Sequence, residues 1–151
     1  MTLSYEMVFS RARGRINDPK ELALKETDLI EIYTERLHNV MGNSRIRRLF
    51  SSVILDDEIQ EMEFTLNNSV DEASDKDFVC DILILGMTIE WLQPQVDSLK
   101  SVAEAMGTKE EKMLLNPHKT NIDRLDSMKK ELHRMIRDYG YMYNSYINSE
   151  S

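Results

Sequence analysis

The stretch from residue 77 to residue 92 constrains the fold more than any other part of this chain, because it is apolar on nearly every side. Its sequence, DFVCDILILGMTIEWL, is longer than a typical strand. A helix that is hydrophobic all round belongs in a protein interior. The stretch therefore predicts a central buried helix, whose predicted core residues are Phe78, Ile82, Leu85, Ile89, Trp91 and Leu92.

Three residues in or beside this predicted helix carry further expectations. Gly86 lies in its interior, where glycine costs roughly 1 kcal/mol relative to alanine, so we expect another backbone to approach it closely. Pro94 is expected to end or kink the helix, because proline lacks the N–H group that a helix interior needs. Cys80 is expected to be a small, inert core residue, since its neighbours are apolar.

A second strong helical pattern lies near the end of the chain, at residues 121–139. Apolar residues recur there at helical spacing, while the lysines and arginines mostly fall on other faces, and Gly140 is expected to stop the helix. The core residues of this pattern are predicted to be Leu125, Leu132 and Ile136. The pattern predicts a long amphipathic helix.

The remaining helical signals are shorter. They predict helices at residues 2–16, 28–41 and 96–106. The first of these is expected to break at Asn17-Asp18-Pro19, because the residue before a proline is pushed out of the helical region and aspartate caps a new helix. The second is expected to begin with Thr27 or Asp28 as its cap.

The other segments predict little helix. Residues 51–66 alternate polar and apolar side chains as strands do, so a small β-hairpin is the expectation there. Residues 67–76 are polar and acidic and predict a loop. Residues 108–120 contain Pro117 and predict a connector.

These patterns predict a mainly α fold, a small helical bundle formed by a single domain at residues 1–139. Five glycines and three prolines in 151 residues favour helix over disorder. We expect no membrane span, because acidic residues interrupt the longest apolar run. The single cysteine rules out an intrachain disulfide, which is typical of a protein that matures in a reducing cytosol.

Residues 140–151 (GYMYNSYINSES) are expected to be a tail that docks on a neighbouring chain. The segment is too aromatic to be meant only for solvent, and aromatic side chains are frequent interface anchors. The residues predicted to bind a partner are Tyr141, Tyr143, Tyr146 and Ile147, together with Arg134 and Arg137 of the preceding helix.

Charge is unevenly distributed along the chain. Residues 51–110 contain 14 acidic and three basic residues, whereas the flanking segments are nearly balanced. The net charge of −8 argues against binding of nucleic acid over the whole surface, since such binding depends on lysine and arginine. Two basic groupings, at residues 45–48 and 129–137, could contact phosphates, which places nucleic-acid binding second to protein binding.

The sequence contains no pattern of catalytic, cofactor-binding or metal-binding residues. His38, His118 and His133 lie on separate segments without metal-ligand spacing. There is no phosphate-binding glycine loop, no nucleophile elbow and no calcium loop. We therefore predict a protein that is not an enzyme and holds no cofactor.

Residues 75–141 resemble a known family of virion proteins. The segments GMTIEWLQPQV, MGTKE and KKELHRMIRDY, in this order, resemble the head-to-tail connectors, or adaptors, of tailed bacteriophages. Residues 18–37 resemble the opening helices of these adaptors less closely, and the acidic segment at 56–76 departs most from the family.

This resemblance implies a structural subunit of the phage neck, assembled in the host cytoplasm and located in the virion. It implies a homo-oligomeric ring of about twelve copies that joins the portal protein to tail proteins and lines the DNA channel, with non-specific contact to DNA. One alternative is another assembly protein, a stopper or tail-completion protein. The other is a small phage regulator that binds nucleic acid through its basic C-terminal helix.

Overall fold

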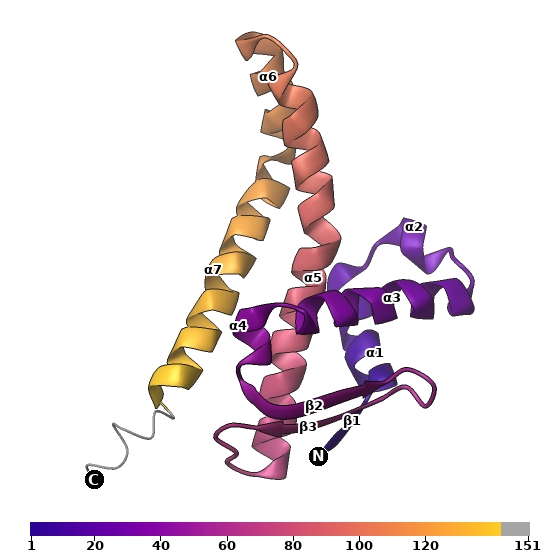
Figure 1. Ribbon diagram of the computed structural model, residues 1–151. Coiled ribbons are helices and arrows are strands. Elements are labelled where there is room, and N and C mark those ends of the chain that lie inside the picture. The colour runs from indigo at the N-terminus through magenta and orange to yellow at the C-terminus, as the bar shows by residue number, and fades with distance from the viewer. Residues whose placement is uncertain (143–151) are drawn as a thin grey trace.

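The computed structural model describes residues 1–142, with side chains to residue 140, and shows a mainly helical protein with a small antiparallel sheet (Figure 1). The elements, in chain order, are β1 (Thr2–Ser4), α1 (Tyr5–Ile16), α2 (Pro19–Leu22), α3 (Glu26–Met41), α4 (Ser44–Arg47), β2 (Phe50–Asp56), β3 (Glu61–Leu66), α5 (Glu72–Glu104), α6 (Thr108–Leu115), the 3-10 turn η1 (Asn116–His118) and α7 (Lys119–Met142).

The central apolar helix is confirmed, but α5 is longer at both ends than the sequence predicts. It begins at Glu72 because the Asp71 side chain accepts a hydrogen bond from the Ser74 backbone N–H at 2.7 Å, so the predicted loop at 67–76 is wrong in its second half. It also continues through Pro94 to Glu104, so Pro94 does not end the helix, and the helical pattern predicted at 96–106 belongs to α5 up to residue 104.

The core surrounds the middle of α5, which packs against α1, α3 and α7. Of the residues expected in its core, Ile82, Leu85 and Leu92 are buried. The other three, Phe78, Ile89 and Trp91, are half-buried and pack against the same cluster. Gly86 is approached closely, though by the side chain of Val40 on α3 and not by a backbone.

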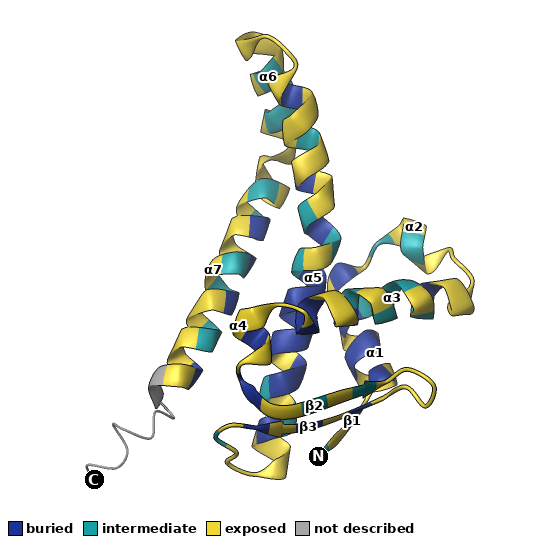
Figure 2. Cartoon of the chain, in the orientation of Figure 1, coloured by how far each residue is buried: buried dark blue, intermediate teal, exposed yellow. Residues whose placement is uncertain are grey.

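The long C-terminal helix is also confirmed, and its buried side faces α5 (Figure 2). Leu125 and Leu132 are buried, and Ile136 is half-buried against the core. The helix does not stop at Gly140 but continues to Met142. Residues 140–142 are therefore helical, whereas the sequence predicts that they belong to the tail.

The hairpin predicted at 51–66 is confirmed, with β2 and β3 paired antiparallel. A third strand, β1, pairs with the other edge of β3, which gives the order β1-β3-β2. The sequence predicts a helix from residue 2, but this helix begins at Tyr5, where the Ser4 side chain accepts a hydrogen bond from Met7 N–H. Three residues are too few for a strand pattern to be recognised in a sequence.

Local capping explains most of the connections. The predicted break after α1 is confirmed, because Asn17 is left-handed with a φ of 44° and Asp18 caps α2 by accepting from Lys20 N–H. Helix α3 begins at Glu26 after Lys25, so neither Thr27 nor Asp28 is its cap.

The connector predicted at 108–120 is wrong, because most of it is helical. Helix α6 begins after Gly107, whose backbone N–H donates to the Glu110 carboxylate at 3.0 Å. The end of α5, α6 and the start of α7 form a helical hairpin that projects from the rest of the molecule (Figure 1). Among the described residues, no helix is long and apolar enough to cross a membrane.

Candidate interaction surfaces

The residues predicted to bind a partner lie at the end of α7. Arg134 and Arg137 are exposed, and the guanidinium of Arg137 is 3.5 Å from the carboxylate of the adjacent Asp138. Tyr141 is within α7, but its side chain is outside the described part. The other three predicted contact residues, Tyr143, Tyr146 and Ile147, lie outside the described residues.

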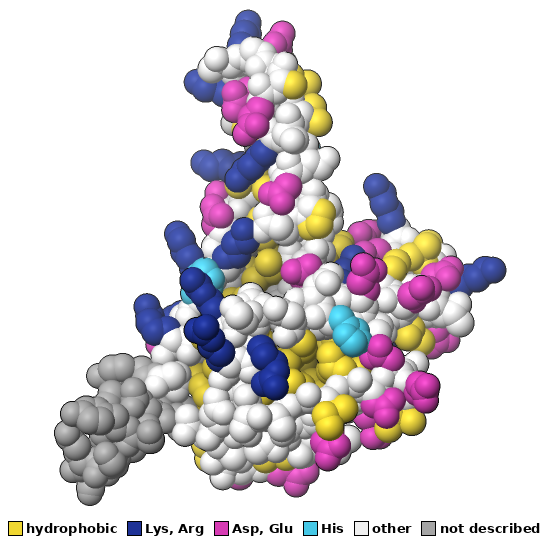
Figure 3. Space-filling view, in the orientation of Figure 1, with side chains coloured by type: hydrophobic (Ala, Val, Ile, Leu, Met, Phe, Trp, Pro, Cys, Tyr) yellow, Lys and Arg dark blue, Asp and Glu magenta, His cyan; other side chains and the backbone are white. Residues whose placement is uncertain are grey.

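The fold brings together the two basic groupings that are separate in the sequence. The Arg45 guanidinium lies 3.2 Å from Nε2 of His133, which joins the short helix α4 to α7. Lysine and arginine side chains accordingly gather over α4 and α7 in Figure 3. We call this surface the basic face and define it by four exposed residues: Arg45, Arg48, Lys130 and Arg134.

A groove of about 290 Å³ opens at the edge of the basic face, between α4, the segment after β3 and the end of α7. Arg45 and Arg48 line it together with the apolar side chain of Ile136 and the ring of Tyr139. We call it the arginine groove. Its combination of apolar and cationic lining suits an aliphatic side chain flanked by carboxylates.

A second groove of about 380 Å³ lies beside the first, between the start of α5 and the end of α7. Its wall is formed by Phe78 and Tyr139, whose rings stack with their centroids 4.8 Å apart. The Tyr139 hydroxyl accepts a hydrogen bond from the Asn68 backbone N–H at 2.9 Å. The buried Asp75 carboxylate accepts hydrogen bonds from Ser69 and from the Val70 N–H, so it fixes the β3–α5 loop and serves the fold.

The turn between β2 and β3 is acidic, in contrast to the basic face. Contacts among Tyr5, His38 and Asp57 fix its position. The Tyr5 hydroxyl donates to Asp57 Oδ1 at 2.6 Å, and His38 Nε2 lies 2.8 Å from Asp57 Oδ2. The hydrogen bond from Tyr5 lowers the pKa of Asp57, with a smaller contribution from His38. Burial, followed by the contact with Asp57, raises the pKa of Tyr5.

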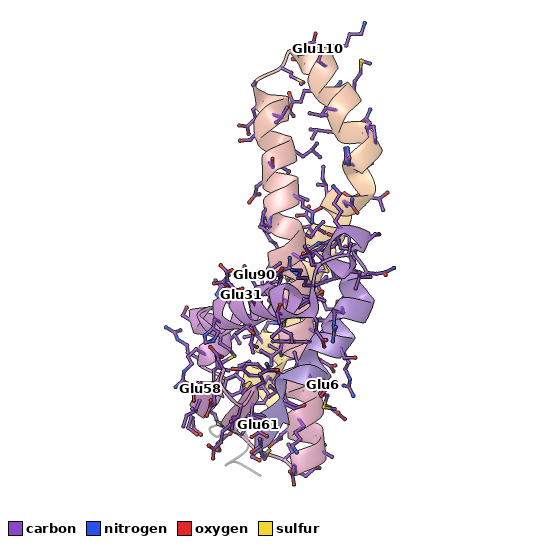
Figure 4. The ribbon with its side chains drawn as sticks, turned by 90° about the vertical axis from the view of Figure 1, so that its right-hand side faces the viewer. Glu6, Glu31, Glu58, Glu61, Glu90 and Glu110 are labelled. Carbon is purple, nitrogen blue, oxygen red and sulfur yellow. The ribbon has the colours of Figure 1, made fainter. Side chains whose placement is uncertain are left out.

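Within this turn, the Asp56 carboxylate accepts from the N–H groups of Glu58 and Ile59 at 3.1 and 3.4 Å. The Tyr5 backbone N–H also donates to the Gln60 carbonyl at 2.9 Å. These bonds leave Ile59 pointing into solvent, with 63% of its surface exposed. Figure 4 shows Glu58 and Glu61 at this turn, below Glu31 of α3 and Glu90 of α5.

Sequence reasoning did not single out this turn. The sequence shows an acidic run at residues 56–58. It does not show the contacts of Asp57 with Tyr5 and His38, because these residues are 52 and 19 positions away along the chain. The one available signal was Ile59, an isolated aliphatic residue among acidic ones.

Among the described residues, the titratable groups do not form a recognisable catalytic centre. Burial raises the pKa of the Cys80 thiol, which is fully buried, so its thiolate is disfavoured. His38 and His133 contact different partners on different faces, and Tyr5, the neighbour of the His38–Asp57 pair, is buried. In the part of the chain that the structure describes, no group of three His, Cys, Asp or Glu residues could hold a metal ion.

Comparisons with protein-family models, with curated proteins and with solved structures found no match to this chain.

Proposed function

We propose that this chain is a non-enzymatic assembly subunit, specifically a head-to-tail connector of a bacteriophage neck that joins the portal to tail proteins. The resemblance of residues 75–141 to phage adaptors supports the proposal. The mainly helical fold also agrees with an adaptor better than with a stopper or tail-completion protein, which would usually rest on a β-rich core. The two oppositely charged faces suit a protein that contacts several neighbours.

The projecting hairpin is the observation that carries this proposal. Three large apolar side chains on it are exposed: Val102 by 48%, Met106 by 42% and Met113 by 68%. From residue 97 to the end of α6, only Ala103 is buried. This part of the molecule therefore adds little to the core. An extended element with exposed apolar residues is typical of a surface that another protein covers. The portal is the partner that we propose for it.

The test is the mass of the protein alone and mixed with the portal protein of the same phage, measured by light scattering after size exclusion. A stable complex or a ring of the free protein is expected. A Met113→Asp variant should lose the portal complex, whereas Leu22→Asp, at a residue 50% exposed on α2, should keep it. A monomer that ignores the portal, or equal binding by both variants, would contradict the proposal.

Nucleic-acid binding is the second candidate function, and the basic face is the observation that favours it. Arg45, Arg48 and Arg134 form no ion pair within the described part of the chain, so their charges are available to phosphates. The affinity for DNA would fall steeply as the salt concentration rises. In an Arg45→Ser/Arg134→Ser variant the affinity would depend less on salt, because fewer phosphates are contacted. Unchanged mobility of DNA mixed with the wild-type protein at low salt would exclude this function.

A further inference from the structure

We propose that the β2–β3 turn of one copy docks in the arginine groove of a second copy, with Ile59 at the centre of the contact and Glu58 and Glu61 facing Arg45 and Arg48. This inference rests on the proposed function as an assembly subunit and names the surfaces through which successive copies meet. The occupant of the arginine groove is therefore another molecule of the same chain.

The turn is already fixed in shape before any partner binds. Asp57 is held from two sides by Tyr5 and His38, and Asp56 is bonded to the backbone of the turn. Gln60 has a φ of 54°, and its carbonyl accepts the hydrogen bond from Tyr5 N–H. A segment that is rigid in its bound shape loses little conformational entropy on association, which favours binding.

Apart from Asp57, the carboxylates of the turn form no ion pair with the described residues of their own chain. Asp56 and Glu61 lie directly opposite each other on β2 and β3, and both are exposed. Like charges in this position destabilise a strand pair. Among the described residues, neither carboxylate is in an ion pair, and neither is that of Glu58. A cationic surface placed over the turn would relieve this repulsion.

The arginine groove offers the matching surface. Arg45 and Arg48 are exposed at its rim, and Ile136 supplies an apolar contact inside it. The guanidinium of Arg45 contacts a histidine nitrogen and no carboxylate among the described residues. An aliphatic side chain in the middle with charge pairs around it reproduces the apolar centre and polar rim of protein interfaces.

One copy cannot make this contact with itself. Figure 1 places the β2–β3 turn on the opposite side of the molecule from α4 and α7, and Figure 3 shows acidic side chains around the turn and basic ones over α4 and α7. A contact between two different surfaces is heterologous, so each added copy presents a new free turn or groove. Such contacts generate closed rings or open filaments.

The experiment uses two charge-reversal variants of the full chain, Glu58→Lys/Glu61→Lys in the turn and Arg45→Glu/Arg48→Glu in the groove. Self-association is measured by sedimentation over a range of concentrations, after circular dichroism has shown native helicity. Each variant alone should self-associate at least about tenfold more weakly, because it places like charges against each other. An equimolar mixture should assemble again, since the lysines of one variant then face the glutamates of the other.

A substitution at the centre of the contact gives an independent measure. Ile59→Ser should weaken self-association, whereas Met113→Ser, at a similarly exposed apolar residue on the projecting hairpin, should not. Wild-type protein that stays monomeric at every concentration, or variants that assemble normally, would overturn the inference. A groove variant that loses only DNA affinity would also overturn it. Portal binding that persists in these variants would leave the proposed function standing.

Discussion

Val40 on α3 packs against Gly86 on α5 so closely that a Cβ atom at position 86 would lie 2.7 Å from Val40 Cγ1 and 3.0 Å from Cγ2. Real Cβ atoms do not approach other carbons to this distance, and the branched side chain of Val40 has little freedom to move away. The glycine therefore sets how closely α3 crosses α5. This explains a residue that otherwise weakens the most apolar helix of the chain.

We predict that Gly86→Ala destabilises the protein. Overpacking against Val40 outweighs the better helix propensity of alanine, so the free energy of unfolding should fall by about 1 to 2 kcal/mol in urea denaturation. Gly14→Ala is the matched control, because nothing lies within 4 Å of a Cβ at that position in α1. The control should be more stable than wild type, and Val40→Ala should relieve the Gly86→Ala variant.

Tyr5→Phe is predicted to raise the pKa of Asp57, because the hydrogen bond from Tyr5 is the largest cause of its lowering. A carboxyl whose pKa is lower in the folded chain stabilises the fold at neutral pH, and this contribution is lost as the pH falls through the folded-state value. The variant should therefore be less stable than wild type at pH 7, and the part of the difference due to Asp57 should vanish at low pH.

Carbon NMR titration of the Asp57 carboxyl would measure its pKa, and urea denaturation at pH 7 and at a pH below that value would measure the change in stability. Tyr33→Phe serves as the control, since Tyr33 is equally buried but is not among the causes of the Asp57 shift. An unchanged Asp57 pKa in Tyr5→Phe would show that the hydrogen bond does not determine it.

The sequence predicted those parts of the fold that depend on a local, repeated pattern. The apolar run of α5, the stripe of α7 and the alternation of β2 and β3 each extend over several residues with the same period. These patterns follow directly from burial on one or all sides. The break before Pro19 was also predictable, because it depends on the backbone geometry of proline.

The sequence could not predict what depends on distant partners. Strand β1 exists because β3 offers it a free edge, and its three residues carry no pattern of their own. The basic face forms because Arg45 meets His133, which is 88 positions away. Likewise, nothing in the acidic run at the β2–β3 turn indicated that Tyr5 and His38 would hold it in place.

Cys80 is predicted to react with a thiol reagent only when the protein unfolds. Its side chain is fully buried, and burial raises the pKa of the thiol. If reaction requires opening on the order of 5 kcal/mol, it should be at least about a thousandfold slower in native protein than in urea. A Ser101→Cys variant, with its new thiol at an exposed position, should show one fast and one slow thiol. Two fast thiols would contradict the burial of Cys80.

Pro94 lies inside α5, two residues before Val96, and beyond Val96 only Ala103 of this helix is buried. Proline has no N–H to bond to the Glu90 carbonyl, and the sequence alone therefore favoured a helix end or a kink. The helix continues because Leu92 and Val96, on either side of the proline, are both buried. Trp91 adds to this anchoring, since its indole N–H donates to Asp18 at 3.0 Å.

We predict that Pro94→Ala stabilises the protein and, if the proposed function holds, weakens the proposed binding to a portal protein. The restored N–H and the better propensity of alanine should raise the free energy of unfolding by about 1 to 2 kcal/mol, less than the full cost of a helical proline because the surrounding packing has adapted to it. Because proline commonly bends the axis of the helix that contains it, we expect its removal to redirect the hairpin that carries Met106 and Met113. Ser98→Ala, at an exposed position one turn further along α5, should give a smaller gain and keep portal binding. If Pro94→Ala bound the portal as wild type does, the direction of the hairpin would not matter for that contact.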